Sequence, residues 1–256
     1  MHHLSVDTYA AMESPLHRLD ARVKLAAALA WTAAAVSEGR LEIAGLLPYL
    51  VPPLALLLVS GVPAGFVLQR ILIVSPFAIL LAGTAALFEP GPVTATAGPW
   101  TATVRGGLVV GASILLKFLV STLALLLLAT TTRLSRLAGA MSALGMPRLL
   151  AMQVTILYRY LFLVVDEMER RKRAAAARTV GTAGAGAGAR AAGSQLASLF
   201  ARSLERAERV NQAMAARGFD GTPPRTSGER LRAADVVFLA AMLSLAAGLR
   251  LRALWL

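Results

Sequence analysis

The sequence predicts an all-α fold: a polytopic membrane helical bundle of about five spans, with long cytoplasmic helices. Three observations lead to this prediction. Hydrophobic residues make up 57% of the chain and charged residues only 16%, whereas a soluble domain carries about 25% charged residues. Apolar runs of membrane-spanning length recur along the chain. The basic residues behind the formal net charge of +12 concentrate in one segment before the last of these runs.

The apolar runs set the expected membrane helices. A bilayer core needs about 20 mostly apolar residues per helix. We expect spans at residues 23–36, 41–60, 66–88, 106–130 and 233–249. The first is short, and Ala21 and Arg22 extend it at the interface. The second contains Pro48, Pro52 and Pro53, which a membrane helix tolerates when neighbouring groups satisfy the backbone.

Two features flank the later spans. The Pro/Gly-rich stretch at residues 89–101, EPGPVTATAGPWT, predicts a loop between the third and fourth spans. Trp100 in this stretch suits a membrane interface. After the last span, Arg250 and Arg252 are expected to anchor the chain at the opposite interface.

The charge distribution predicts the orientation in the membrane. Residues 131–232 hold 17 of the 26 Lys and Arg residues but only 7 of the 14 Asp and Glu residues. The positive-inside rule places such a segment in the cytoplasm. Four preceding spans then place the N-terminus, with Arg18 and Lys24, on the same side. The chain divides into an N-terminal segment with four membrane helices at 1–130, a cytoplasmic region at 131–232 and a final membrane helix at 233–256.

One segment of the cytoplasmic region is apolar enough to cross the bilayer. It covers residues 149–165, LLAMQVTILYRYLFLVV. If it crossed, residues 166–173, DEMERRKR, would lie outside, against the positive-inside rule. Arg159 would also lie within the span. We interpret the segment as part of a long helix against the inner face of the bundle, with a sixth crossing as the alternative.

Three helices are expected in the cytoplasmic region, at residues 134–144, 147–178 and 194–217. The last is amphipathic, with one face at three- and four-residue spacing formed by Leu196, Phe200, Ser203, Ala207, Val210 and Met214. Ser194 is a candidate N-cap and Gly218 a candidate helix stop. The Ala/Gly-rich residues 181–193 predict a flexible connector between the two long helices.

The sequence excludes several kinds of chemistry. It has no phosphate-binding P-loop and no nucleophile elbow. Cysteine is absent and the three histidines all precede residue 18, so no metal-ligand cluster is expected on the helices. We therefore expect no catalysis, no cofactor and no metal ligand in this chain.

Lys117 is the one ionisable residue deep within an expected span. It lies eleven residues into the fourth span, which is about 16 Å at helical rise. An intramembrane cation is a functional candidate. The simpler interpretation, which we favour, is a lysine that donates to the carbonyls of a neighbouring helix. Asp235, near the start of the last span, is most simply a helix N-terminal acid.

The ends of the two long cytoplasmic helices share a pattern: an arginine between small residues. Arg217 is also seven residues past Val210, nearly in line with the apolar stripe. Such an arginine can enter a groove on a partner protein and form forked bonds to carboxylates or carbonyls. The two triplets are Ala177-Arg178-Thr179 and Ala216-Arg217-Gly218.

At these residues the sequence resembles the transmembrane energy-coupling (T) component of energy-coupling factor (ECF) importers, in its CbiQ branch. The paired Ala-Arg-Gly motifs of that family match the two triplets, with Thr179 as a departure. Residues 14–25, SPLHRLDARVKL, also resemble the family's N-terminal signature, with Ala21 where Pro is expected. The likeness covers nearly the whole chain.

The resemblance implies a function and partners. Two long coupling helices would dock their arginine tips on CbiO-like ECF ATPase subunits. The T component would pass ATP-driven motion to CbiM/CbiN-like substrate-binding membrane subunits, which import cobalt or nickel. The expected partners are these subunits and the lipid bilayer, with no nucleic acid.

Two other functions remain open on the residues alone. A stand-alone carrier or channel is suggested by Lys117 and the Pro-rich second span, although the near absence of intramembrane acids argues against it. A membrane-anchored binder of nucleic acid or anionic lipid is suggested by charge alone. Glu205 and Glu208 reduce the basic character of the last cytoplasmic helix, which favours docking to a protein instead.

Overall fold

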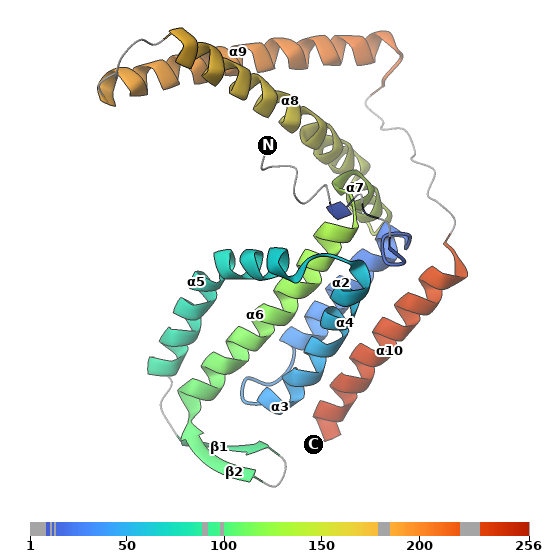
Figure 1. Cartoon of the computed structure of the whole chain (residues 1–256). Coiled ribbons are helices and arrows are strands. Elements are labelled where there is room, and N and C mark those ends of the chain that lie inside the picture. Colours follow the sequence, from blue (N-terminus) through green and yellow to red (C-terminus); the bar gives the residue numbers. More distant parts are fainter. Residues whose placement is uncertain are drawn as a thin grey trace. The chain divides into compact units, whose positions relative to one another are not determined.

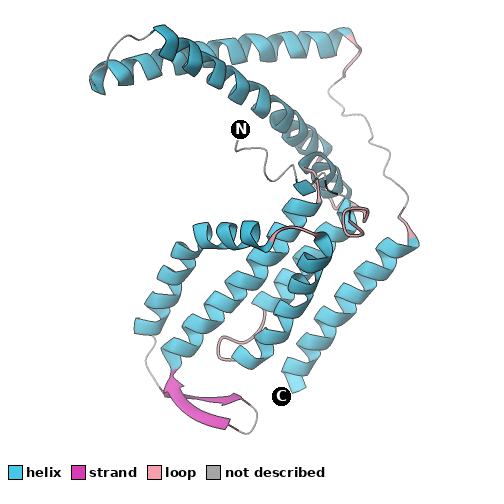
Figure 2. Cartoon of the chain, viewed as in Figure 1, coloured by secondary structure: helices cyan, strands magenta, loops and turns pink. Residues whose placement is uncertain are grey.

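The structure, a computed structural model, describes residues 9–10, 12, 14–88, 92–97, 100–178, 185–220 and 231–255. The chain forms two compact units. Unit 1 comprises Met1–Ala140 and Gly228–Leu256, and unit 2 comprises Met141–Ser227. Helices dominate both units (Figure 1, Figure 2). Unit 2 is thus an insertion within the sequence of unit 1.

Unit 1 is a bundle in which α6 contacts α5, α2 and α4, while α10 contacts α2 (Figure 1). Its helices are α2 (Ala21–Val36), α3 (Ile43–Leu46), the short 3-10 helix η2 (Leu47–Leu50), α4 (Val51–Ser60), α5 (Ala64–Phe88), α6 (Gly106–Thr131) and α10 (Ala233–Trp255). The remaining elements are strands β1 (Pro92–Ala97) and β2 (Trp100–Arg105), helix α7 (Leu134–Ala143), which begins in unit 1, and the two helices of unit 2, α8 (Arg148–Arg178) and α9 (Ala185–Ala216).

Helix α2 is the short central helix of the bundle. It begins at Ala21 because the Asp20 side chain caps it, accepting a hydrogen bond from the Arg22 N–H at 2.7 Å. Trp31 and Ala35 are fully buried against other elements of unit 1. Its 16 residues are about 24 Å long, shorter than the bilayer core of about 30 Å.

The second expected span is a helical run at Ile43–Ser60 in which the 3-10 turn η2 lies between α3 and α4. Pro48 lies at the start of η2, and Pro52 follows the first residue of α4. A proline is accommodated in the first turn of a helix, where its missing N–H would have no intrahelical partner. The run therefore stays helical across its prolines, as expected, with a change of helix type between them.

Helices α5 and α6 pack with their backbones in close contact through two glycines. A Cβ added at Gly107 would lie 2.5 Å from the Ala86 carbonyl oxygen, and one at Gly111 would lie 2.8 Å from that of Ala82. The spacing Gly-x-x-x-Gly opposite small residues is the usual means of close helix approach in membranes. Figure 1 shows α5 bent along its length, as expected from Pro76 within it.

The loop expected at residues 89–101 is largely a β-hairpin. Strands β1 and β2 pair antiparallel from Pro92 opposite Arg105 to Ala97 opposite Trp100. Val and Thr recur in both strands, and β-branched residues favour extended backbone. The Pro and Gly residues of the stretch indicated a loop, but the Val/Thr alternation between them decided the local structure.

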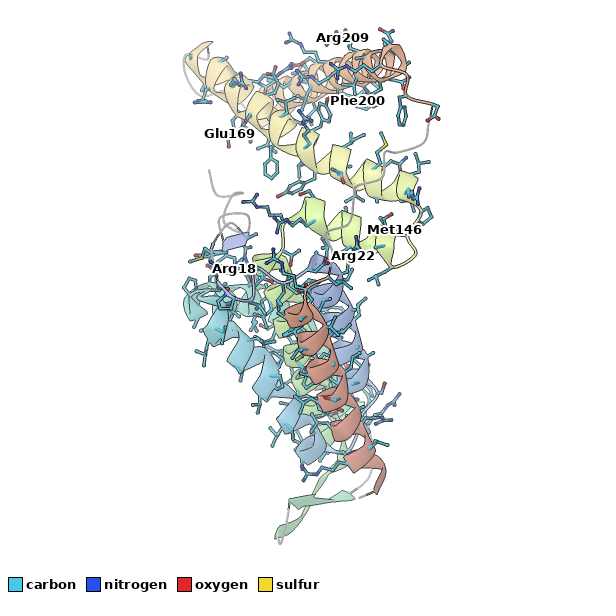
Figure 3. The ribbon with its side chains drawn as sticks, turned by 90° about the vertical axis from the view of Figure 1, so that its right-hand side faces the viewer. Arg18, Arg22, Met146, Glu169, Phe200 and Arg209 are labelled. Atoms are coloured by element: carbon cyan, nitrogen blue, oxygen red, sulfur yellow. The ribbon has the colours of Figure 1, made fainter. Side chains whose placement is uncertain are left out.

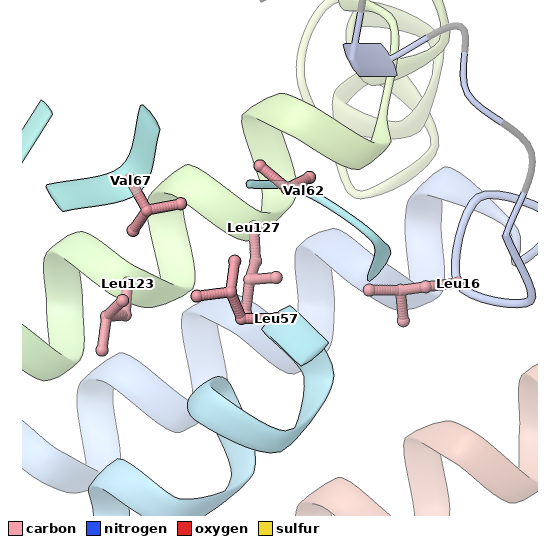
Figure 4. Packing of buried hydrophobic residues seen from close by; sticks show 6 residues of the cluster. All are labelled: Leu16, Leu57, Val62, Val67, Leu123 and Leu127. Carbon is pink, nitrogen blue, oxygen red and sulfur yellow. The ribbon is translucent and has the colours of Figure 1, made fainter. Parts of the chain in front are cut away.

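The largest apolar cluster of unit 1 joins α4, α6 and the segments before α2 and around the start of α5. Its buried members are Leu16, Leu57, Val62, Val67, Leu123 and Leu127 (Figure 4). Large apolar side chains nevertheless remain exposed on α5, Phe77 and Leu80 among them. Such a surface suits a lipid environment, whose hydrocarbon is as apolar as leucine.

The prediction of a flexible connector at residues 181–193 is wrong from Ala185 onward. Helix α9 begins at Ala185, because alanines favour the helix strongly enough to offset the cost of the glycines between them, about 1 kcal/mol each. Ser194 therefore lies inside the helix and is not its N-cap. Its hydroxyl donates to the Ala191 carbonyl at 2.9 Å.

Within the described residues, five helices are long and apolar enough to cross a membrane: Ile43–Ser60, Ala64–Phe88, Gly106–Thr131, Arg148–Ala177 and Ala233–Arg252. Four of them match expected spans. Helix α2 is not among the five, whereas α8 is. The topology that keeps residues 149–165 on the inner face therefore stays a prediction.

Candidate functional site

The end of α9 is a defined structure around Arg217. Gly218 has φ +81°, a left-handed conformation that favours glycine. The Phe219 N–H bonds the Met214 carbonyl at 3.0 Å, and the Gly218 N–H bonds that of Ala215 at 2.9 Å. This pair of bonds is the Schellman motif, which ends a helix and satisfies its last carbonyls. Gly218 is thus the predicted helix stop.

Arg217 occupies the C-cap position of this motif. Its side chain is exposed, as is that of the preceding Ala216. Among the described residues, the guanidinium of Arg217 has no hydrogen-bond or ion-pair partner. The Schellman bonds fix the backbone beneath it, so an exposed side chain with free donors extends from a fixed helix end.

The end of α8 coincides with the first triplet. Arg178 is the last helical residue and Ala177 before it is exposed. The side chain of Arg178 and the whole of Thr179 lie outside the described residues. The chain returns at Ala185, where α9 begins.

The two arginines belong to different helix ends. Arg178 ends α8, and Arg217 follows the last turn of α9. The 32 residues of α9 extend over about 48 Å. Arg217 therefore lies at the far end of α9 from its start at Ala185.

Polar contacts and an apolar groove pair α8 with α9. Arg202 of α9 lies 3.7 Å from Glu167 of α8, and Arg171 of α8 donates to the Ser198 hydroxyl of α9. A groove of about 950 Å³ runs between the helices. Its apolar lining comes from Ile156, Leu163, Val164, Leu199, Val210 and Met214.

Most of the predicted apolar stripe of α9 lies on the face that meets α8. Four of its six residues line the groove, together with Leu199, which the stripe omitted; the four are Ser203, Ala207, Val210 and Met214. Leu196 and Phe200 are 56% and 66% exposed. Figure 3 shows the side chains of this helix, with Phe200 and Arg209 labelled. A helical period of 3.6 residues identified the stripe but did not choose between adjacent rows of apolar residues.

Lys117 is half-buried and belongs to a polar network at the end of α2. Its Nζ donates to the carbonyls of Val36 at 3.1 Å and of Glu38 at 2.7 Å. A cation at this position satisfies the last carbonyls of α2 and complements the helix dipole. These contacts favour the structural interpretation of Lys117 over a role in transport.

Glu38 is the centre of that network, and sequence analysis did not single it out. Its carboxylate is fully buried and accepts hydrogen bonds from the Tyr49 hydroxyl at 2.7 Å and from Arg250 Nη1 at 3.1 Å. Arg250 thus pairs with an acid within unit 1, where an interface anchor was expected. The sequence feature that could have indicated Glu38 is its position directly after a short apolar run, in Ser37-Glu38-Gly39.

No group of three or more His, Cys, Asp or Glu side chains suited to a metal ion occurs in the described part of the chain. The sites that the structure does define are helix ends and buried hydrogen-bonded groups. They hold helices to one another or leave a cation exposed on the surface.

This fold and these sites define a helical-bundle membrane protein with one β-hairpin and a paired-helix insertion. The family model CbiQ, described as a cobalt transport protein, matches residues 12–227. The chain therefore belongs to the CbiQ family of cobalt transport proteins. Comparison with curated proteins gives no match.

Proposed function

We propose that this chain is the energy-coupling T component of an ECF importer. It links ATP hydrolysis by CbiO-like ATPase subunits to cobalt or nickel uptake by CbiM/CbiN-like substrate-binding membrane subunits. The observation that carries the proposal is the pair of arginine-bearing helix ends, at Arg178 and Arg217, on two paired helices. The two ends are separate in the chain, with the 32-residue helix α9 between them, which suits two docking points on a pair of ATPases.

The division of labour agrees with the sequence. The chain has no P-loop, and its histidines all precede residue 18, so fuel and cargo are bound by partners. A coupling subunit needs fixed protein-docking points, and the Schellman motif at Gly218 fixes one of them. The family is one of transport proteins, and the chain is proposed to have no enzymatic activity of its own.

The decisive experiment removes both arginines in the assembled complex. Arg178→Ala with Arg217→Ala is expected to lower ATPase retention on the order of 1,000-fold, since each interface arginine of this kind contributes about 2 kcal/mol and the pair about 4 kcal/mol. Metal uptake by cells should be lost with it. Arg209→Ala is the matched control, because Arg209 is an exposed arginine of α9 away from its end. Full uptake and normal ATPase recovery in the double variant would refute the proposal.

The proposed orientation places the N-terminus and residues 131–232 in the cytoplasm of a multi-pass protein of the cell membrane. The absence of cysteine makes labelling direct. Single cysteines at positions 94 and 213 should react with a membrane-impermeant maleimide from opposite sides of the membrane. Labelling of both from the same side would overturn this topology.

A stand-alone carrier or channel is the alternative. Lys117, its main motivation, is satisfied by two backbone carbonyls. The purified chain in liposomes, without ATPase, is expected to move no cobalt above the rate of empty vesicles. Saturable transport under those conditions would favour the alternative.

A further inference from the structure

The first turn of α2 holds the start of α10 through one buried carboxylate. Asp235 accepts a hydrogen bond from the Asp20 backbone N–H on Oδ1 and another from the Arg232 N–H on Oδ2, both at 2.8 Å. Only 3% of Asp235 is exposed. The bond to Arg232 caps α10, in whose first turn Asp235 lies. The bond to Asp20 joins residues 215 positions apart in the sequence.

The same turn holds the end of α6 through a buried lysine. Lys24 Nζ donates to the Thr131 carbonyl at 2.8 Å. Both residues are buried. Thr131 is the last residue of α6, and a cation there complements the negative end of the helix dipole.

The start of α7 packs on the same part of α2. Ala21 and Leu25 of α2 form a buried cluster with Leu128 of α6 and Ala140 of α7, and Leu137 packs against it. The first two turns of α2 thus contact α6, α7 and α10, all within unit 1.

These contacts coincide with the two points where the chain leaves and re-enters unit 1. It leaves through α6 and α7, up to Ala140, and it re-enters from Gly228 toward α10. We propose that Asp20, Lys24 and Asp235, together called the α2 anchor, are positioning residues that pass motion of residues 141–227 to the membrane bundle. This inference rests on the proposed function as a coupling subunit.

The α2 anchor can transmit motion because its charged groups are buried, whereas those that pair α8 with α9 are exposed. The ion pair of Arg202 with Glu167 is exposed at 70% and 33% of the two side chains, where water and salt weaken it. The bonds of the α2 anchor are buried and charge-assisted, which makes them stronger and less easily exchanged for water. A displacement of the end of α6 or of the start of α10 is therefore carried into α2.

Helix α2 also has a fixed far end. Lys117 of α6 binds the carbonyls after its last turn, and Arg250 of α10 binds Glu38. The same two helices are therefore tied to α2 at both of its ends. A displacement at the anchor moves the three helices together instead of bending one of them.

The test uses the full complex in proteoliposomes, with ATP hydrolysis and cobalt uptake measured on the same preparation. Asp235→Ala removes both acceptors and should leave ATP hydrolysis within about twofold while uptake per ATP falls on the order of tenfold. Lys24→Met, which keeps the length of the side chain, should act in the same direction. Glu208→Ala, a loss of one exposed acid on α9, is the control and should leave the ratio unchanged. An unchanged ratio in Asp235→Ala and Lys24→Met would overturn the inference.

Two further measurements separate coupling from stability. If uptake and hydrolysis fall in parallel with the amount of assembled complex, the anchor is merely structural and the inference is wrong. Should Asp235→Ala not assemble, Asp235→Asn, which keeps one acceptor oxygen, decides by the same ratio. If the unaltered complex shows no ATP-dependent uptake, the proposed function itself fails. If the unaltered complex and the variants show the same uptake per ATP, only the role of the α2 anchor is refuted.

A covalent replacement completes the test. Because the chain has no cysteine, Asp20→Cys with Asp235→Cys can be joined by a short bis-maleimide linker. The unlinked variant should be uncoupled, and linking should restore uptake per ATP. Linking that instead blocks uptake would show that the contact must open during transport, which would overturn the proposal.

Discussion

Gly111→Ala tests whether the backbones of α5 and α6 must touch. The added Cβ would meet the Ala82 carbonyl oxygen at 2.8 Å, and this oxygen is a backbone atom that cannot rotate away. Ordinary contact begins near 3.4 Å, so the helices would have to separate locally by about 0.6 Å. Gly83 of α5 is the matched control, since a Cβ there has nothing within 4 Å.

The expected magnitude follows from two opposing effects. Overpacking of this kind costs about 1–3 kcal/mol. Replacement of glycine by alanine within a helix contributes up to about 1 kcal/mol in the opposite direction. Gly111→Ala should therefore lower the free energy of unfolding by about 1–2 kcal/mol, while Gly83→Ala should leave it unchanged or raise it slightly.

Thermal unfolding of the purified chain in detergent measures the difference. A domain of this size shifts its midpoint by about 2–4 °C per kcal/mol, so Gly111→Ala should melt about 3–6 °C below the unaltered chain. The comparison with Gly83→Ala cancels general effects of an added methyl group. Equal midpoints for the two variants would show that close packing at Gly111 does not stabilise the bundle.

Three further predictions concern charges and helix ends. Glu38→Gln should lower the thermal midpoint by several degrees, because two buried hydrogen bonds to a charged acceptor are weakened at about 2 kcal/mol in all; the exposed Glu42→Gln should not, and equal midpoints would contradict the network. Gly218→Val should expose the end of α9 to faster limited proteolysis, since a β-branched residue at φ +81° costs about 1–2 kcal/mol; an unchanged cleavage rate would refute the Schellman assignment. Asp20→Ala should cost about 1 kcal/mol of unfolding free energy as a lost N-cap, whereas Ser194→Ala should stay within about 0.5 kcal/mol; similar losses would argue that α9 begins at Ser194.

Composition and local pattern predicted the fold class and most helix positions. Runs of about 20 apolar residues placed α5, α6 and α10 to within a few residues, and glycine after a periodic stretch identified the stop at Gly218. These features are local, so a single window of sequence contains the information. The two arginine triplets could be recognised for the same reason.

Long-range pairs could not be predicted in the same way. Glu38 and Arg250 are 212 residues apart, and Asp20 and Asp235 are 215 apart. Nothing in either local pattern indicates the other member of the pair, because the fold brings them together. The local sequence places Lys117 within an expected span, but it contains no information that α2 ends beside this lysine.

Local patterns also failed where two propensities competed. The alanines and glycines around residue 185 favour opposite structures, and the helix formed from Ala185 onward. The hairpin at Pro92–Arg105 is the reverse case, because Pro and Gly suggested a loop where Val and Thr formed strands. The secondary structure of such a segment depends on the sum of opposing propensities, each about 1 kcal/mol per residue.

The insertion of Met141–Ser227 between two halves of one bundle makes that segment an exchangeable cassette. The part of α7 before it packs on the first turns of α2, and α10 after it starts beside Asp20, so the bundle's own contacts there do not depend on the inserted segment. On the proposed coupling function, a chimera carrying the corresponding segment of a relative should keep the membrane partners of the recipient while taking the ATPase preference of the donor. Under that proposal, the two sets of partners can change independently within a single polypeptide.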